Sequence, residues 1–125
     1  MKISDIVALL EADVLAGRDG LEREVPSAGG CDIISDLLFF GKPGMLLLTG
    51  LTQPSVVRTA HLMDIAAIVF VRGKRPDERA IELAESLGMP LLVSPHSLYD
   101  CCGRLYVLGL PGVIGSTRRL QAECA

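Results

Sequence analysis

Polar residues follow three short apolar segments of the chain, and their types suit the binding of an anion. In chain order these residues are Thr49, Gly50, Thr52, Arg72, Gly73, Lys74, Ser94, His96 and Ser97. The arginine and the lysine are cations, the hydroxyl groups can hydrogen-bond to oxygen atoms, and predicted helices that follow the loops begin with unpaired N–H groups. If the three loops meet in space, they predict a site for a nucleotide or another small phosphate compound.

The three apolar segments have the pattern of buried parallel strands. Residues 45–48 and 67–71 are continuously apolar rather than alternating, as expected of strands covered on both faces. Leu91-Leu92-Val93 is the third segment. We therefore predict a single α/β domain with a mostly parallel sheet flanked by helices, its core strands at about 45–49, 67–71 and 91–93. Because right-handed crossovers place the carboxyl ends of parallel strands at one edge, where ligands of open α/β sheets bind, the polar residues should converge there.

Apolar side chains at helical spacing, behind residues that cap helices, predict the helices. These are expected to begin near Ser4, Ser35, Pro54, Pro76 and Ser97. Ser4, Thr52 and Ser97 are predicted N-caps, and the helix near Ser35 is expected to use Asp32 or Ser35 as its cap. Gly88 stands where a helix commonly ends in a left-handed glycine. His61 is expected on or near the buried face of the helix that starts at Pro54.

Further elements are predicted toward the two ends of the chain. Near the N-terminus, Asp13–Ala16 and residues 21–25 are expected to form a hairpin around a turn at 17–20. The last helix is expected to bury Leu98, Cys101, Leu105 and Leu108. A final short strand is predicted at Val113 and Ile114. We expect the domain to span residues 1–115 and the polar, aperiodic residues 116–125 to form a loosely held tail.

The composition predicts one cytoplasmic domain that binds neither nucleic acid nor membranes. A chain of 125 residues is near the commonest size of a single domain. The net charge of −3, the scattered lysines and arginines and an aromatic content of 4% argue against nucleic-acid binding. The longest apolar run, residues 65–71, is far too short to span a membrane, and Asp5 and Glu11 interrupt the region in which a secretion signal would lie.

The cysteines predict reduced thiols rather than a metal site. Cys31, Cys101, Cys102 and Cys124 form neither a C-x-x-C motif nor a pair with histidine at zinc-finger spacing. Cys101 and Cys102 are neighbours on a predicted helix, so their side chains diverge by about 100°. The sequence also has no G-x-S-x-G elbow and no P-loop, and neither histidine has an evident nucleophile partner. We expect no catalytic residues, no bound metal and no cofactor.

Several segments of the chain together resemble the DRTGG domain family. They are Asp32-Ile33-Ile34-Ser35-Asp36, Leu48-Thr49-Gly50-Leu51-Thr52, Pro54-x-Val56-Val57-Arg58-Thr59-Ala60, Ile68-Val69-Phe70-Val71-Arg72-Gly73-Lys74-x-Pro76-Asp77 and Gly88-Met89-Pro90-Leu91-Leu92. The resemblance covers residues 3 to about 113, and it is greatest to short stand-alone members encoded near iron-only hydrogenases in anaerobic microbes. Such domains also accompany CBS domains in pyrophosphatases and occur in large phosphotransacetylases, and the N-terminal domain of HPr kinase has a related fold.

The chain departs from the motif after which the family is named. The family's Asp-Arg pair would fall on Leu51 and Thr52, and its Thr-Gly-Gly would fall on Val71, Arg72 and Gly73. Only the last glycine is shared. The role that the Asp-Arg pair has in relatives is therefore not transferred to this chain, and the resemblance to HPr kinase implies no kinase activity because the P-loop is absent.

The resemblance implies a non-catalytic regulatory or accessory module that forms a homodimer and is linked to an iron-only hydrogenase or another metabolic enzyme. An apolar content of 50% in a small chain agrees with self-association. Two alternatives stay open. One is a sensor of a nucleotide or small phosphate at the residues described first, and the other is a metal or redox accessory protein that uses Cys31, Cys101 and Cys102.

Overall fold

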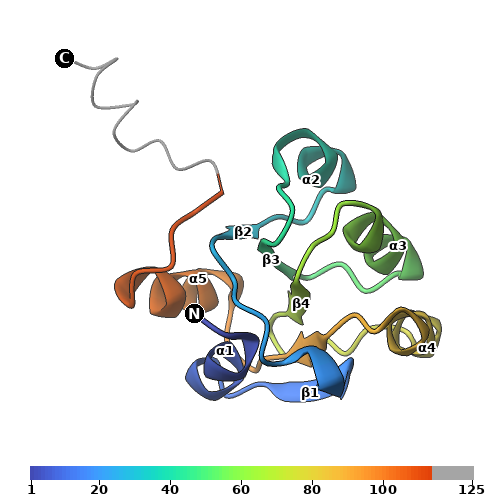
Figure 1. The fold of residues 1–125 in the computed structure, drawn as a ribbon, viewed down its shortest axis with the longest axis horizontal. Helices are drawn as coiled ribbons and strands as arrows, with labels where there is room; N and C mark the ends of the chain where they lie inside the picture. The colour runs from blue at the N-terminus through green and yellow to red at the C-terminus, as the bar shows by residue number, and fades with distance from the viewer. Residues whose placement is uncertain (114–125) are drawn as a thin grey trace.

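The computed structural model describes residues 1–113, which fold into a five-stranded sheet between two layers of helices (Figure 1). In chain order the elements are α1 (Ile3–Leu9), β1 (Asp13–Ala16), the 3₁₀ turn η1 (Arg18–Gly20), β2 (Ala28–Gly30), α2 (Ile34–Phe40), β3 (Leu46–Thr49), α3 (Pro54–Leu62), β4 (Ala67–Phe70), α4 (Glu78–Leu87), β5 (Leu91–Val93) and α5 (Leu98–Val107). The predicted α/β class is confirmed.

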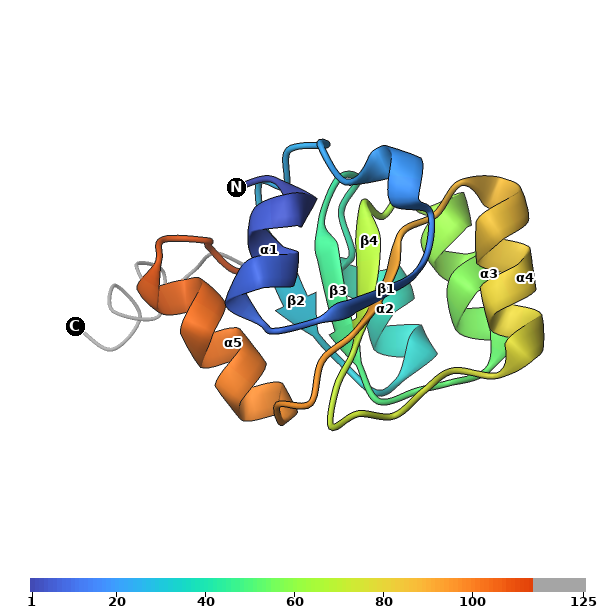
Figure 2. The same cartoon turned by 90° about the horizontal axis from the view of Figure 1, so that it is seen from below.

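The strands lie in the order β1-β5-β4-β3-β2, and all neighbours are parallel except β1, which runs antiparallel to β5. Helices α2, α3 and α4 cover one face of the sheet, and α1 and α5 cover the other (Figures 1 and 2). This arrangement explains the unbroken apolar runs of the central strands. Every residue of β3 and β4 is buried because both faces are covered.

Alternate residues of the central strands belong to two separate cores. Leu47, Ile68 and Phe70 pack with the buried side chains of α3 and α4. Leu46, Leu48 and Val69 pack with those of α1 and α5 on the opposite face. Each large side chain that is fully removed from water contributes about 1.5–3 kcal/mol, so the two cores supply most of the stabilisation.

Two predicted helix boundaries are confirmed by their local geometry. Gly88 ends α4 with a φ of 68°, in the left-handed region that a side chain would disfavour. Ser97 precedes α5, and its hydroxyl oxygen accepts a hydrogen bond from the Asp100 N–H at 3.1 Å. Both signals depend on a few neighbouring residues, which is why the sequence is sufficient to find them.

Other predicted caps are wrong, and each of these helices begins in a different way. Helix α1 begins at Ile3 rather than Ser4, since the Asp5 carboxylate accepts the N–H of Lys2 at 3.0 Å. No side chain of the described residues caps α3, and the Thr52 carbonyl instead accepts the Asp77 N–H at 3.1 Å. The residue preceding α2 is Ile33, and Asp32 hydrogen-bonds to the end of β3 instead of capping that helix.

The predicted N-terminal hairpin is also wrong. Strand β1 pairs with β5, so that Asp13 lies opposite Val93 and Val14 opposite Leu92. After Gly17, whose φ is 70°, turn η1 leads the chain away from β1. Residues 21–25 then run beside the start of α1, where the Val25 N–H donates to the Met1 carbonyl at 2.7 Å. Strand β1 thus pairs with the edge of β5, which is distant in the sequence, and not with the adjacent residues 21–25.

Strand β2 lies in a region whose glycines and proline predict a chain break. Its glycines are extended rather than turned, and side chains of α5 lie close above Gly30. A Cβ added at Gly30 would lie 3.0 Å from Leu98 Cδ1 and 3.4 Å from Cys102 Sγ, both on α5. The small residues therefore let α5 approach the sheet edge.

The remaining expectations concern exposure and the C-terminal end. His61 is exposed rather than on the buried face of α3, and Leu108 is 60% exposed, whereas Leu110 is buried in its place. The Val113 N–H bonds to the Ala28 carbonyl at 3.1 Å, while Ile114 and the predicted tail at 116–125 lie outside the described residues. No helix in the part of the chain that the structure describes is long and apolar enough to cross a membrane.

Candidate functional site

The three loops that follow β3, β4 and β5 meet at the carboxyl edge of the sheet and are joined by backbone hydrogen bonds. The Val71 N–H donates to the Thr49 carbonyl at 3.1 Å. The Gly73 N–H donates to the Ser94 carbonyl at 2.8 Å, and the Arg72 N–H donates to the His96 carbonyl at 2.7 Å. The candidate residues named from the sequence are thus neighbours in the fold, as the parallel topology requires.

The backbone N–H groups of the loop after β4 are bonded within the fold, whereas its cationic side chains are exposed. Arg72 and Gly73 have φ values of 59° and 65°. Their N–H groups are both used in the bonds to the loop after β5, and the Lys74 N–H donates to the Val71 carbonyl at 3.1 Å. The side chains of Arg72 and Lys74 are exposed. Any anion at this loop would therefore be held by the two cations.

Asp32 is part of the same edge, although the sequence indicates it only as a helix cap. Its Oδ1 accepts the Gly50 N–H at 2.7 Å and the Thr49 hydroxyl at 3.2 Å. Asp32 follows β2, which the sequence does not predict as a strand. Because β2 is parallel to β3, the residue after it must lie at the same edge as Thr49. The position of Asp32 at this edge thus depends on β2 being a strand of the sheet.

At Gly50, side chains of opposite charge approach the backbone. A Cβ built on Gly50 would lie 3.1 Å from Arg72 Nη2 and 3.5 Å from Asp32 Oδ1. A guanidinium and a carboxylate thus lie beside one buried glycine at the end of a central strand. The arrangement can accept a ligand that carries both a negative group and hydrogen-bond donors.

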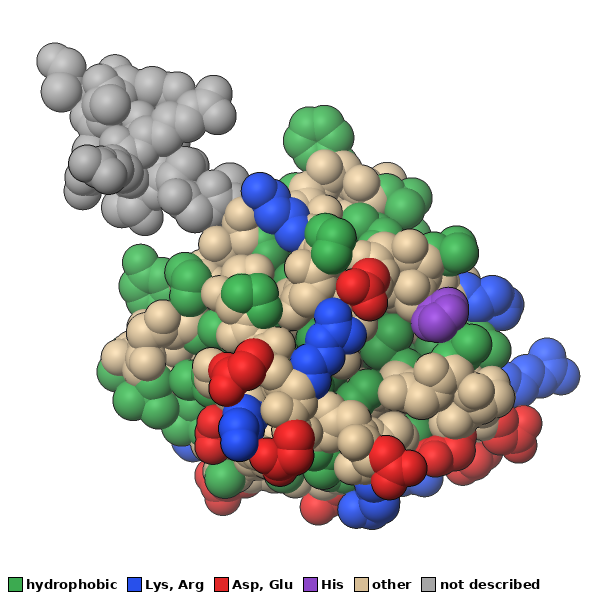
Figure 3. Space-filling model, viewed as in Figure 1, with side chains coloured by type: hydrophobic (Ala, Val, Ile, Leu, Met, Phe, Trp, Pro, Cys, Tyr) green, Lys and Arg blue, Asp and Glu red, His purple; other side chains and the backbone are tan. Residues whose placement is uncertain are grey.

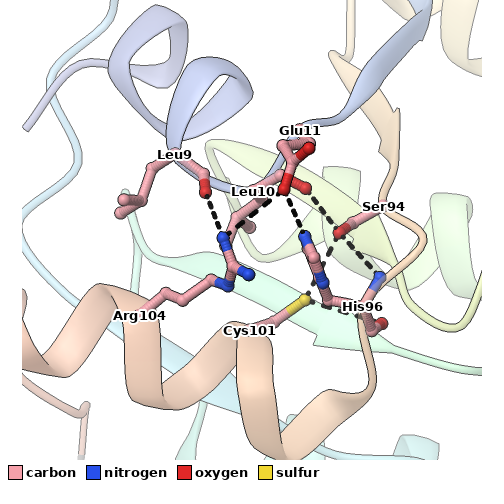
Figure 4. Close-up of polar contacts among 7 residues, drawn as sticks. All are labelled: Leu9, Leu10, Glu11, Ser94, His96, Cys101 and Arg104. Atoms are coloured by element: carbon pink, nitrogen blue, oxygen red, sulfur yellow. Dashed lines mark hydrogen bonds and ion pairs between the residues drawn. The ribbon is translucent and has the colours of Figure 1, made fainter.

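The loop after β5 contributes mainly to structure (Figure 4). The Ser94 side chain is buried, and its hydroxyl donates to the Leu10 carbonyl at 2.7 Å. His96 Nε2 lies 3.0 Å from Glu11 Oε1, at the end of α1. Ser97 caps α5. These three predicted ligand-binding residues are therefore engaged in contacts that attach α1 and α5 to the sheet.

The cysteines lie in separate environments. Cys31 Sγ donates to the Ile33 carbonyl at 3.4 Å, and Cys101 is buried beside the Ser94 hydroxyl at 3.6 Å. Burial raises the pKa of the thiols of Cys31, Cys101 and Cys102 above their ordinary value, which keeps them protonated. Residues 1–113 contain no group of three or more His, Cys, Asp or Glu side chains that could hold a metal ion, and Cys124 lies outside this range.

Comparison with known proteins identifies the fold. No protein-family model matches the chain, and no curated protein matches it. Among solved structures it is similar to the crystal structure of the CBS and DRTGG domains of the regulatory region of Clostridium perfringens pyrophosphatase, complexed with the activator diadenosine tetraphosphate. The two share 18% sequence identity with a TM-score of 0.71 over 93% of this chain, which spans half the length of the solved chain. The likeness supports a DRTGG-like α/β fold for this protein.

Proposed function

We propose that the protein is a non-catalytic regulatory module that binds a nucleotide at the carboxyl edge of its sheet. The observation that carries the proposal is the approach of Arg72 and Asp32 to Gly50, which is buried and donates its N–H to Asp32. Asp32 and Arg72 are both exposed beside this buried glycine, so a ligand at the edge can contact the guanidinium and the carboxylate together. Thr52 lies on the same loop as Gly50 and Lys74 lies on the loop after β4, and both add polar groups to this edge.

The pair of opposite charges favours a nucleotide over a bare phosphate. Arg72 and Lys74 supply charge-assisted hydrogen bonds to phosphate oxygens. The Asp32 carboxylate repels a second negative charge but accepts hydrogen bonds from hydroxyl or amino groups, which a nucleotide carries on its ribose and base. A nucleotide separates these two kinds of group within one molecule. Inorganic phosphate carries its P–OH donors on the same charged group, so it cannot place its negative charge and its donors apart.

A regulatory role is consistent with the fold. The similar solved structure belongs to the regulatory region of a pyrophosphatase and is complexed with a nucleotide activator. Function does not follow from fold alone, so this likeness adds to the geometry of the site and does not replace it. In this chain a bound nucleotide would join the loops after β2, β3 and β4, and it would stabilise the sheet edge as a unit.

The test is a thermal-shift titration of the protein with ATP, GTP and inorganic phosphate. A nucleotide at one hundred times its dissociation constant adds about 2.7 kcal/mol to the free energy of unfolding, which raises the melting temperature of a chain of this size by roughly 10 °C. Arg72→Ala and Asp32→Asn should each remove most of this rise. Phosphate should produce a much smaller one.

Arg23→Ala is the matched control, because it also removes one guanidinium but acts far from the site. Arg23 pairs with Asp64 at 3.5 Å, before the amino end of β4. The control variant should keep the full nucleotide-induced rise. If neither nucleotide raises the melting temperature, or if Arg72→Ala keeps the wild-type rise, the assignment to this edge is wrong.

The second candidate function is a protein-binding role, in which the chain forms a homodimer and contacts an iron-only hydrogenase or another metabolic enzyme. Exposed large apolar side chains favour it, among them Phe39 at 91% and Tyr99 at 87% exposed. The hydrogenase follows from the family resemblance alone. Co-elution of the purified protein with a purified iron-only hydrogenase tests that partner. Separate elution at micromolar concentrations would contradict the assignment of the hydrogenase as a partner.

A further inference from the structure

Helix α5 carries a line of exposed residues on the side that faces away from the sheet. Its inward side is formed by Cys101 and Leu105, which are fully buried. The outward line consists of Tyr99, Gly103, Tyr106 and Val107, which recur at the spacing of one helix face, and we term it the α5 stripe. Tyr99, Tyr106 and Val107 are 87%, 65% and 83% exposed. Figure 3 shows apolar side chains gathered over α5, at the left of the view.

Gly103 is the unusual member of this line. Glycine in a helix interior weakens the helix relative to alanine, so a glycine at this position calls for a reason. Packing within the chain gives none, because a Cβ added at Gly103 would meet no atom of the described residues within 4 Å. The missing side chain instead leaves a notch at the centre of the stripe, through which another backbone can approach α5 closely.

Hollows lie on both sides of the stripe. One, of about 360 Å³, is bounded by the glycines of β2, Cys102 and Leu110. The other, of about 560 Å³, is bounded by Leu9, Asp100, Arg104 and Leu108. A ridge of side chains with a groove on each side is the surface that a second helix fits when its own ridge enters the groove.

We propose that the α5 stripe is the surface through which two copies of this chain associate, with their α5 helices antiparallel and crossing at Gly103. The proposal deepens the self-association named above as the second candidate function and rests on it. In such a pair a twofold axis passes near Gly103, and residues at equal distances before and after it meet. Tyr99 of one copy then packs on Val107 of the other.

The stripe is complementary to itself under this twofold axis, which favours a second copy over a different partner. Asp100 precedes Gly103 by three residues and Tyr106 follows it by three, so the Asp100 carboxylate faces the Tyr106 hydroxyl of the second copy. Arg104 faces Cys102, and its guanidinium is already paired with Glu11 at 3.6 Å. No two like charges are placed opposite each other by this pairing.

The two tyrosines supply part of the area that a stable pair needs. Two largely exposed tyrosines offer about 300 Å² per copy, and Val107 with the walls of the two hollows adds to this. A standard interface buries about 800 Å² per partner. Aromatic side chains at the centre of an interface are the residues that most often carry its binding energy.

Sedimentation equilibrium of the full chain tests the proposal. The wild type should sediment at twice 13.3 kDa at tens of micromolar. Gly103→Arg fills the notch with a long side chain and should weaken the dimer by about tenfold or more, as substitutions at the centre of an interface commonly do. Ser86→Arg is the matched control, since it adds the same charge at an exposed position of α4 and should leave the dimer unchanged.

Circular dichroism separates dissociation from unfolding. The Gly103→Arg chain should keep its helical signal, because the added Cβ meets open space. Val107→Asp provides a second dissociating variant that leaves the glycine intact. If the wild type sediments as a 13.3 kDa monomer, both the self-association and the α5 interface are refuted. The nucleotide-binding proposal would not be affected by that result. If the wild type is a dimer and both variants dimerise with an affinity within tenfold of the wild-type value, only the assignment of the interface to the α5 stripe is refuted.

Discussion

Replacement of Ser94 by alanine is a direct test of the inference that this residue is structural rather than a ligand contact. Its side chain is 0% exposed. Its hydroxyl donates to the Leu10 carbonyl at 2.7 Å and accepts the His96 N–H at 3.3 Å (Figure 4). Alanine fits the same space and makes neither bond. The substitution therefore leaves the Leu10 carbonyl, at the end of α1, with its hydrogen-bonding partner removed.

The expected cost is that of a buried polar group without a partner. Such a group costs about 1–3 kcal/mol, and the alanine introduces no overpacking that would add to it. Since 1 kcal/mol shifts the melting temperature of a domain of this size by roughly 3–5 °C, Ser94→Ala should lower it by about 6–10 °C if the cost is near 2 kcal/mol. The rise induced by nucleotide should stay as in the wild type.

Thermal unfolding of Ser94→Ala with and without ATP measures both quantities at once. Ser86→Ala is the control, because Ser86 is exposed and its hydroxyl donates to the Leu83 carbonyl within its own helix, at 2.7 Å. That change should stay within about 0.5 kcal/mol. A loss below about 2 °C for Ser94→Ala would refute the structural role, and an abolished nucleotide shift would make Ser94 a ligand contact.

Two further predictions follow from packing and burial. Gly17→Ala should lower the free energy of unfolding by more than about 3 kcal/mol, or prevent folding, because its Cβ would lie 2.4 Å from Pro90 N in a backbone with a φ of 70°. Urea unfolding measures this change. A decrease below roughly 1 kcal/mol, the cost of a mild core substitution, would contradict the prediction. Burial raises the pKa of Cys101 above its ordinary value of 9.0. As the pH rises, the thiol therefore loses its proton in the unfolded chain before it does so in the folded chain. The free energy of unfolding consequently falls as the pH rises from 9.0 toward the folded pKa. Cys101→Ala should therefore show a smaller decrease in urea midpoint between pH 8 and pH 10 (about one unit either side of that value) than the wild type, and equal decreases would contradict this reasoning.

Features that depend on neighbouring residues were determined by the sequence itself. The central strands follow from continuous apolar runs, because a strand buried on both faces has no polar side to present. The end of α4 follows from Gly88 and the start of α5 from Ser97, since each signal is read within one turn of helix. The gathering of the Thr49, Arg72 and Ser94 loops at one edge follows from parallel topology alone.

The partners of each element were decided only by the tertiary structure. The local pattern of Asp13–Ala16 indicates a strand but not that β5, far along the chain, would be its neighbour. The glycines of β2 suggest a turn until the approach of α5 to Gly30 is seen. Asp32 and Ser94 have side chains that could cap a helix or bind a ligand. Long-range contacts determine which acceptor or donor each one meets, because hydrogen bonds form with whatever the fold places within about 3 Å.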